Sequence, residues 1–253
     1  MPGNIKVRVG TDGIKEASKE RNVVVVVDVL RASSTMITAI NNGALSIIPA
    51  STICRAKELA KTTPNSILCG ERRGLRISGF QLGNSPSEYS SQRVRNMNIV
   101  LTTSNCTRIL ERCKQLPSCE DTLIGAFLNA TAVAKKAKRL AVDEGTDISI
   151  IQAGEGEKPS RDDSACAQLI KRKIESKARA NSKVVERIMT DSLIYSLLSK
   201  TRHGRYLIRM GFNDDIRYCS QLDTTIVVPK IYRTIGGNEI EVRAYNDHRR
   251  RKI

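Results

Sequence analysis

The sequence contains few of the residues that build common metal and redox centres. It has two histidines, His203 and His248, and none of its seven cysteines forms a CxxC pair. Because zinc sites combine cysteine and histidine ligands at close spacing, this composition excludes a zinc-finger type of site. We expect the cysteines to be reduced thiols that are mostly buried.

Long apolar runs are missing as well. The longest of them, such as Val23–Val27, are far shorter than the roughly 20 residues that cross a bilayer. The first residues, MPGNIKVRVG, lack the apolar core of a secretory signal. We therefore expect a cytoplasmic protein without a membrane partner, and the sequence leaves open whether the chain forms a homo-oligomer.

Several familiar phosphate-binding motifs are absent. No GxxxxGK[ST] sequence occurs, which excludes a P-loop NTPase, and GEGEKP lacks the spacing of a dinucleotide-binding fingerprint. The haloacid dehalogenase signature needs a second aspartate two residues after the first, and Leu30 occupies that place after Asp28. No cysteine is followed by the arginine loop of a cysteine phosphatase.

Positive charge is what the sequence has in excess, with a formal net charge of +16. Much of it lies in Lys171–Arg187 and Arg249–Lys252. Such charge suits a nucleic acid, an anionic membrane surface or an anionic small substrate. With three Phe, six Tyr, no Trp and no recognition motif, the sequence favours a solvated basic face over a specific nucleic-acid partner. Non-specific nucleic-acid binding stays open as an alternative.

Short apolar runs alternate with amphipathic stretches of helical length. This alternation predicts an α/β protein, a three-layer α/β/α fold with a largely parallel or mixed sheet. We expect strands at Val23–Val27, Leu45–Pro49, Ser66–Cys69, Asn98–Thr102, Thr122–Ile124, Ile148–Gln152 and Thr225–Val228, and helices at about 34–42, 52–61, 105–115, 129–143 and 163–177. No linker divides the chain, so we expect one domain over residues 1–253, with a helical basic segment at about 171–212 and a short basic C-terminal tail.

Polar side chains follow most of the predicted strands. The carboxyl ends of parallel strands meet at one edge of a sheet, where helix N-termini attract anions, so we expect a ligand site there. The candidate residues are Asp28, Arg31, Ser33, Ser34, Thr35, Glu71, Arg72, Asn84, Thr103, Asn105, Arg108, Asn129 and Asp163.

Each of these residues also has a structural explanation. Ser34, Asn105 and Asn129 can each cap a helix, and Asp28 can pair with Arg31. Taken together, however, the hydroxyls and amides suit phosphate oxygens, and arginine suits carboxylate, sulfonate or phosphate. Carboxylates in the same place suit Mg²⁺, which binds one or two of them and keeps several waters. The set indicates a small anionic, phosphorylated substrate and a magnesium ion.

Five segments in the same order resemble the 2-phosphosulfolactate phosphatase family, magnesium-dependent acid phosphatases first associated with coenzyme M biosynthesis. DVLRASST is similar to the family's DVLRATTT, and FQLGNSPSEY to FDLGNSPLEY. LIGAFLNATAVA is similar to IGSFLNASAVA, TTSNCTR to TTTNGTR, and CSQLDTTIVVP to an ending of the form C-x-x-x-D-x-x-x-x-VP. The resemblance spans nearly the whole chain.

The resemblance implies a phosphatase that hydrolyses the phosphate monoester of a small 2-hydroxy acid, with (2R)-3-sulfolactate as the leaving group. It implies Asp28 and Glu71 as magnesium ligands, and the catalytic set Asp28, Arg31, Ser33, Ser34, Glu71 and Asp163. It implies substrate binding by Thr35, Arg72, Asn84, Thr103, Asn105, Arg108 and Asn129. It leaves open which of Asp28, Ser33 and Ser34 would act as a nucleophile.

Two expected ligand loops depart from the family pattern. GERRG replaces the usual GERGG, which puts Arg73 where a glycine normally stands. TTSNCTR has Cys106 where the family pattern has glycine. Another phosphorylated 2-hydroxy acid is therefore the alternative substrate.

Overall fold

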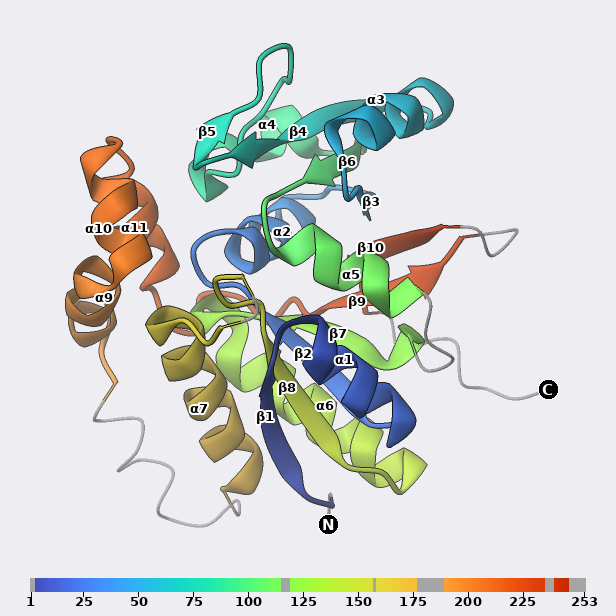
Figure 1. The fold of residues 1–253 in the computed structure, drawn as a ribbon, viewed down its shortest axis with the longest axis vertical. Coiled ribbons are helices and arrows are strands. Elements are labelled where there is room, and N and C mark those ends of the chain that lie inside the picture. The colour runs from blue at the N-terminus through green and yellow to red at the C-terminus, as the bar shows by residue number, and fades with distance from the viewer. Residues whose placement is uncertain (1–2, 115–118, 157, 177–188, 235–238, 246–253) are drawn as a thin grey trace.

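Ten strands form one mixed sheet in the computed structural model, which describes residues 3–114, 119–156, 158–176, 189–234 and 239–245 (Figure 1). The strand order is β1-β8-β2-β7-β9-β10-β3-β6-β4-β5. The strands are β1 (Ile5–Val9), β2 (Val23–Val27), β3 (Ser46–Pro49), β4 (Ser66–Arg72), β5 (Leu75–Arg76), β6 (Asn98–Thr102), β7 (Thr122–Gly125), β8 (Ile148–Gln152), β9 (Pro229–Arg233) and β10 (Ile240–Ala244).

Helices pack on the sheet, and the predicted α/β class is confirmed. They are α1 (Gly10–Lys19), α2 (Ala32–Asn41), α3 (Ile53–Thr62), α4 (Ser91–Val94), α5 (Cys106–Lys114), α6 (Ala130–Glu144), α7 (Arg161–Glu175), α9 (Asp191–Lys200), α10 (Arg202–Arg209) and α11 (Asn213–Cys219). None of the helices in the described part of the chain is long and apolar enough to cross a membrane.

The sheet consists of two parallel groups of strands joined by a hairpin. Strands β1, β8, β2 and β7 run parallel to one another, and β3, β6 and β4 form a second parallel group. The hairpin β9–β10 lies between these groups and pairs antiparallel with β7 on one side and β3 on the other. The prediction of a largely parallel or mixed sheet is therefore correct. The β9–β10 hairpin and the edge strand β5, which pairs antiparallel with β4, make the sheet mixed.

The run of five valines in β2 is buried on both faces. Val24 and Val26 pack into a core with α1, α2 and α5, whereas Val23, Val25 and Val27 pack into a second core with α6 and α7. Side chains alternate across a strand, so only a continuous apolar run can fill both cores. Full burial of one such side chain contributes about 1.5–3 kcal/mol to folding. The strand is consequently a rigid support for the residues that follow it.

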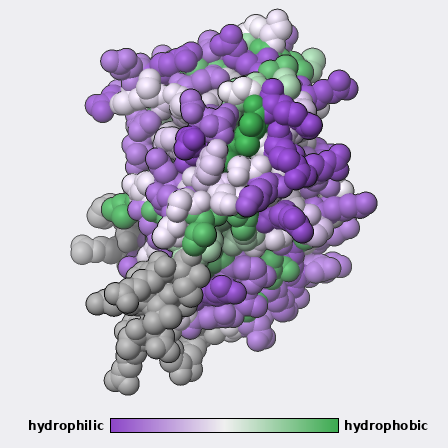
Figure 2. Space-filling model, turned by 90° about the vertical axis from the view of Figure 1, so that its left-hand side faces the viewer, coloured by the Kyte–Doolittle hydropathy of each residue, from purple (hydrophilic) through white to green (hydrophobic). Residues whose placement is uncertain are grey.

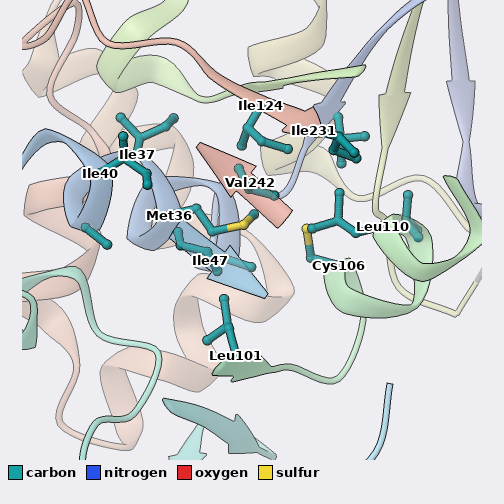
Figure 3. Close-up of a cluster of buried hydrophobic side chains, with 14 of the residues drawn as sticks. Met36, Ile37, Ile40, Ile47, Leu101, Cys106, Leu110, Ile124, Ile231 and Val242 are labelled. Carbon is teal, nitrogen blue, oxygen red and sulfur yellow. The ribbon is translucent and has the colours of Figure 1, made fainter. Parts of the chain in front are cut away.

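The first of these cores also contains Cys106, which the sequence placed in an expected ligand loop (Figure 3). Figure 3 shows its sulfur near Leu110, in the cluster that Met36, Ile47 and Leu101 share. Burial raises the pKa of the Cys106 thiol well above its usual value. Cys106 therefore acts as a small apolar core residue.

Five predicted helices are present close to their predicted bounds, as α2, α3, α5, α6 and α7. The predicted strand Thr225–Val228 is wrong, because the sheet pairing begins only at Pro229. The Thr225 N–H donates to the Leu128 carbonyl, and the Val227 carbonyl accepts from the Asn129 amide. Residues 225–228 are therefore held by the β7–α6 connection and not by a neighbouring strand. The pattern also missed β1, α1, β5, α4, α11 and β10.

The predicted basic segment, residues 171–212, contributes α9 and α10 to one side of the molecule. The face that carries α9, α10 and α11 is mainly hydrophilic, with small hydrophobic spots (Figure 2). Within the predicted basic segment 171–212, α9 and α10 are helical as expected. Residues 177–188 of that segment and the C-terminal tail 246–253 lie outside the described residues.

Candidate active site

A cavity of about 260 Å³ lies at the carboxyl ends of β2, β4 and β6. Its lining is formed by Asp28, Leu30, Arg31, Glu71, Arg73, Gly74, Asn84, Thr103, Ser104, Asn105, His203 and Tyr206. Six residues predicted from the sequence are brought together here, namely Asp28, Arg31, Glu71, Asn84, Thr103 and Asn105. The expectation that strand ends converge on one site holds for these three strands.

Asp28 stands directly after β2 and is 8% exposed. Its Oδ1 accepts a hydrogen bond of 3.2 Å from the Ala32 N–H at the start of α2. Burial, aided by the negative charges of Asp162 and Glu71, raises the pKa of Asp28 to about 7, although the Ala32 bond and the charge of Arg31 oppose the shift. A carboxyl group poised near neutral pH in a cavity is typical of a functional site.

Glu71 is the second carboxylate of the cavity, near the end of β4. Its Oε1 accepts the Ser104 N–H at 2.7 Å and its Oε2 accepts the Gly74 N–H at 2.8 Å. Gly70, with φ of +148°, lets β4 approach β6 so closely that a Cβ there would collide with the Thr102 carbonyl. Through its two hydrogen bonds, Glu71 fixes the loop after β6 against the β4–β5 turn.

Asn84 presents an acceptor without a partner. Its side-chain Oδ1 is buried and receives no hydrogen bond from the described residues, although the residue lines the cavity. Its backbone carbonyl accepts from the Thr35 hydroxyl at 2.9 Å, which ties this segment to α2. Because a buried polar atom without a partner is costly, the Asn84 amide oxygen points to a bound group.

Arg31 belongs to the cavity wall, and its guanidinium is held within the protein. One terminal nitrogen donates to Asp215 Oδ2 at 2.6 Å and the other to the Gly74 carbonyl at 2.6 Å. The ring of Phe212 lies under the guanidinium, 4.4 Å from its carbon. Arg31 and Asp215 are each 3% exposed. This buried ion pair joins α11 to the loop after β2.

The three predicted hydroxyls of α2 lie behind the cavity and do not line it. Ser33 accepts from the Asp28 N–H at 2.9 Å, and Ser34 donates to the Val29 carbonyl at 2.9 Å. Together with Thr35, which donates to Asn84, they are fully buried. The hydroxyls of Ser33 and Ser34 thus hold the loop that carries Asp28, and that of Thr35 holds the Asn84 segment.

Asp163 and Asn129 likewise lie outside the cavity lining. The carboxylate of Asp163 accepts the Val29 N–H at 2.8 Å and the Gly154 N–H at 3.0 Å, which joins the loops after β2 and β8. Burial and repulsion by Asp28 raise the pKa of Asp163 to about 7. Asn129 binds the Ala126 N–H and the Ile124 and Val227 carbonyls, so its amide is used in holding the β7–α6 connection.

Two further arginines predicted as substrate-binding residues, Arg72 and Arg108, do not line the cavity. Arg72 donates to the Glu71 carbonyl at 2.7 Å and to the Thr102 hydroxyl at 2.9 Å. Neighbouring side chains in a strand face opposite sides, so Glu71 in the cavity places Arg72 away from it. Arg108 is exposed on α5 and does not line the cavity.

The structure adds residues that the sequence analysis missed. His203 and Tyr206 reach the cavity from α10, and their rings stack 6.1 Å apart. Burial, followed by the charge of Arg31, lowers the pKa of His203, which favours a neutral ring at neutral pH. No local pattern links α10 to strand ends so distant in sequence, so only the tertiary fold reveals these residues.

Comparison with known sequences points to the same family as the motifs. The sequence model of the 2-phosphosulpholactate phosphatase family matches residues 10–234. A relative from Clostridium tetani named "Probable 2-phosphosulfolactate phosphatase" is 36% identical over 232 residues, which cover 90% of this chain and 97% of the relative. One of the same name from Pseudothermotoga lettingae is 32% identical over 219 residues, covering 85% and 92% of the two chains.

The match to the family model includes every residue that lines the cavity. The family match spans most of this chain, and the alignment with each relative covers most of both sequences. The similarity is therefore not confined to a shared fragment. The chain belongs to the 2-phosphosulpholactate phosphatase family of phosphoric monoester hydrolases.

Proposed function

We propose that this protein is a magnesium-dependent phosphatase that converts 2-phosphosulfolactate to sulfolactate and phosphate in the cavity after β2, β4 and β6. The observation that carries the proposal is the convergence of three oxygen donors, Asp28, Glu71 and Asn84, from three separate segments of the chain. The names of the relatives support the choice of substrate.

The oxygen donors of the cavity fit a hard cation. No cluster of three His, Cys, Asp or Glu side chains suited to a metal occurs among the described residues. Mg²⁺, however, is often bound by one or two carboxylates, with waters and substrate phosphate completing its shell. Asp28 and Glu71 would supply the carboxylates, and the unpartnered Asn84 Oδ1 a neutral oxygen. When bound, the ion would neutralise charge that develops on the phosphoryl group.

Asp28 has the central role in this proposal. Ala32 holds one of its oxygens, and Ser33 holds its backbone N–H, so the carboxylate has a fixed orientation. In this position the carboxylate can bind the ion or, in its place, take up a proton from an attacking water. Asp28 is favoured over Ser33 and Ser34 as the reacting group because neither hydroxyl lines the cavity.

The loop after β6 is suited to hold the phosphate. Ser104 and Asn105 line the cavity immediately before α5, whose N-terminus attracts anions through the helix dipole. Glu71 fixes this loop through the Ser104 N–H. We infer that Asn105 and Thr103 position the phosphoryl group, and that Arg31 and Asp163 position the loop that carries Asp28.

Phosphate release from a panel of esters tests the proposed function. The panel holds 2-phosphosulfolactate, 2-phospholactate, phosphoglycolate and 2-phosphoglycerate, each with and without Mg²⁺. We expect the highest kcat/KM on 2-phosphosulfolactate, and loss of release when the ion is chelated. Absence of release from all four compounds would refute the phosphatase proposal.

A second substrate is favoured by one specific observation, the replacement of glycine by Arg73 in the cavity lining. A preference for another phosphorylated 2-hydroxy acid in the same panel would keep the mechanism and change the substrate. Nucleic-acid binding through the basic stretches rests mainly on residues outside the described ranges. It stays a prediction, as do the cytoplasmic location and any homo-oligomer.

Magnesium affinity should depend on pH through Asp28. Its folded pKa of about 7 lies above the ordinary 3.8, so the carboxyl group must lose a proton to bind the ion below neutrality. We expect the affinity for Mg²⁺ to rise by up to about tenfold per pH unit from pH 5.5 to 7 and then to level off. Calorimetric titration of the protein with Mg²⁺ measures this directly.

Asp28→Asn provides the control for this titration. The amide does not titrate, so the variant should bind Mg²⁺ more weakly and without a pH-dependent rise near neutrality. If wild type and variant showed the same affinity across this range, Asp28 would not be a magnesium ligand.

A further inference from the structure

The turn between β4 and β5 contains a residue in an unfavourable conformation. Glu71 pairs with Arg76 and Arg72 with Leu75, so the turn has two residues, Arg73 and Gly74. Their φ angles are +53° and +77°. Two positive φ values identify a type I′ turn, whose central positions favour Gly, Asn or Asp. Arg73, which carries a Cβ and a long side chain, is therefore in a strained conformation.

Three contacts hold the strained turn in place. The Tyr206 hydroxyl donates to the Arg73 carbonyl at 2.8 Å, and Arg31 donates to the Gly74 carbonyl. Glu71 accepts the Gly74 N–H. The backbone of Arg73 is thus anchored from the strand, from α10 and from the loop after β2. Its side chain consequently starts from a fixed point on the cavity wall.

Among the basic residues of the cavity lining, Arg73 has the positive charge that can pair with a ligand. The basic residues that line it are Arg31, Arg73 and His203. Arg31 is paired with Asp215, and the lowered pKa of His203 favours its neutral form. Within the described part of the chain, no side chain or carbonyl accepts a hydrogen bond from the Arg73 guanidinium, which is exposed. Backbone strain at a cavity wall, in a residue with a long cationic side chain, points to a contact between that side chain and a ligand.

We propose that Arg73 binds a second acidic group of the substrate, a sulfonate or carboxylate, at the mouth of the cavity. This inference rests on the proposed function, since it assigns the phosphoryl group to the buried oxygen donors. Asp28 and Asn84 are nearly buried, whereas Arg73 is exposed. A guanidinium binds an oxyanion through two parallel hydrogen bonds. The enzyme would thereby select phosphate monoesters that carry further negative charge.

Arg73→Gly separates this role from general catalysis. We expect kcat/KM for 2-phosphosulfolactate to fall about 10- to 100-fold, because a charge-assisted contact is lost. With p-nitrophenyl phosphate, which has no second acidic group, we expect less than about a threefold change. With 2-phospholactate, a large loss assigns Arg73 to the carboxylate, and a small loss assigns it to the sulfonate. Arg73→Lys should keep part of the preference, and Arg73→Asn should lose it.

Arg21→Gly is a matched control. Arg21 is exposed and has the same φ of +53°, and it stands before β2, away from the cavity lining. Its replacement removes the same strain and the same charge, so the two variants should show similar shifts in Tm. Arg21→Gly should leave kcat/KM unchanged on every ester.

The proposal about Arg73 is overturned if Arg73→Gly leaves 2-phosphosulfolactate hydrolysis unchanged, or lowers hydrolysis of all esters equally. Inactivity of the wild type on every ester would instead refute the proposed phosphatase function. Calorimetric binding of 3-sulfolactate then decides the role of Arg73. Weaker binding by Arg73→Gly than by wild type and Arg21→Gly supports the contact, and equal or absent binding in all three rejects it.

Discussion

Asp28→Asn should lower kcat by about a thousandfold, because it removes the central carboxylate of the cavity. Asparagine keeps the shape of the side chain and an oxygen that accepts the Ala32 N–H. The fold should therefore be preserved while the charge and the proton acceptor are lost. Steady-state phosphate release with saturating Mg²⁺ measures the effect. Activity near that of the wild type would show that the reaction does not depend on Asp28.

The same substitution should not destabilise the protein at pH 8. The folded pKa of Asp28, about 7, lies above the ordinary value of 3.8, so between these values the folded state holds more protons than the unfolded state. The contribution of Asp28 to stability is thus fully present below pH 3.8 and is lost as the pH rises to about 7. Asparagine has no such dependence. Urea unfolding at pH 8 should show a variant at least as stable as the wild type.

Asp162→Asn is the matched control for both measurements. Asp162 is also buried, and burial with repulsion by Asp163 raises its pKa to about 7. It does not line the cavity. The control should therefore reproduce the change in the pH dependence of stability and keep most of the activity. Equal losses of activity in both variants would indicate a general electrostatic effect and not a specific role of Asp28.

Asp215→Ala should produce the largest loss of stability, about 3–5 kcal/mol in the free energy of unfolding. The substitution leaves the guanidinium of Arg31 buried without its counterion, and it also removes the acceptor of the Ser85 hydroxyl, which lies 2.5 Å from Asp215 Oδ1. Taking one partner from a buried pair costs more than the pair itself contributes, because the remaining charge stays desolvated. Urea denaturation measures the effect.

A second variant keeps this prediction testable if Asp215→Ala does not fold. Combining Arg31→Met with Asp215→Leu replaces the whole pair by apolar side chains, and it should recover much of the lost stability. Glu58→Ala, which breaks the exposed pair with Arg55, should have only a small effect. If Asp215→Ala unfolded as readily as Glu58→Ala, the buried pair would not hold α11 to the cavity wall.

Some features of the structure follow directly from the order of residues. The five valines of β2 can fill two cores at once only in a strand buried on both faces, so the α/β class and the position of Asp28 at a strand end are readable from the sequence. Amphipathic periodicity likewise predicted α2, α3, α5, α6 and α7 near their observed bounds. The family could be recognised because five motifs occur in the family's order along the chain.

Other features depend on contacts between distant segments. Which of two neighbouring polar groups at a strand end faces the cavity depends on how the strand packs in the sheet, as the inward Glu71 and the outward Arg72 show. The sequence could not indicate that Ser33, Ser34 and Thr35 hold the segments that carry Asp28 and Asn84, or that Asp163 joins two loops. It also gave no sign that α10 completes the cavity with His203 and Tyr206.

The sequence by itself thus determined the fold class, the family and the strand ends from which the site is built, because hydrophobic periodicity and short motifs are local properties. Tertiary structure alone decided which charges are available. Arg31 is neutralised by Asp215 from α11, whereas Arg73 keeps an exposed guanidinium on a strained turn. Pairing and burial are set by neighbours that are remote in the chain, and these neighbours exist only once the chain has folded.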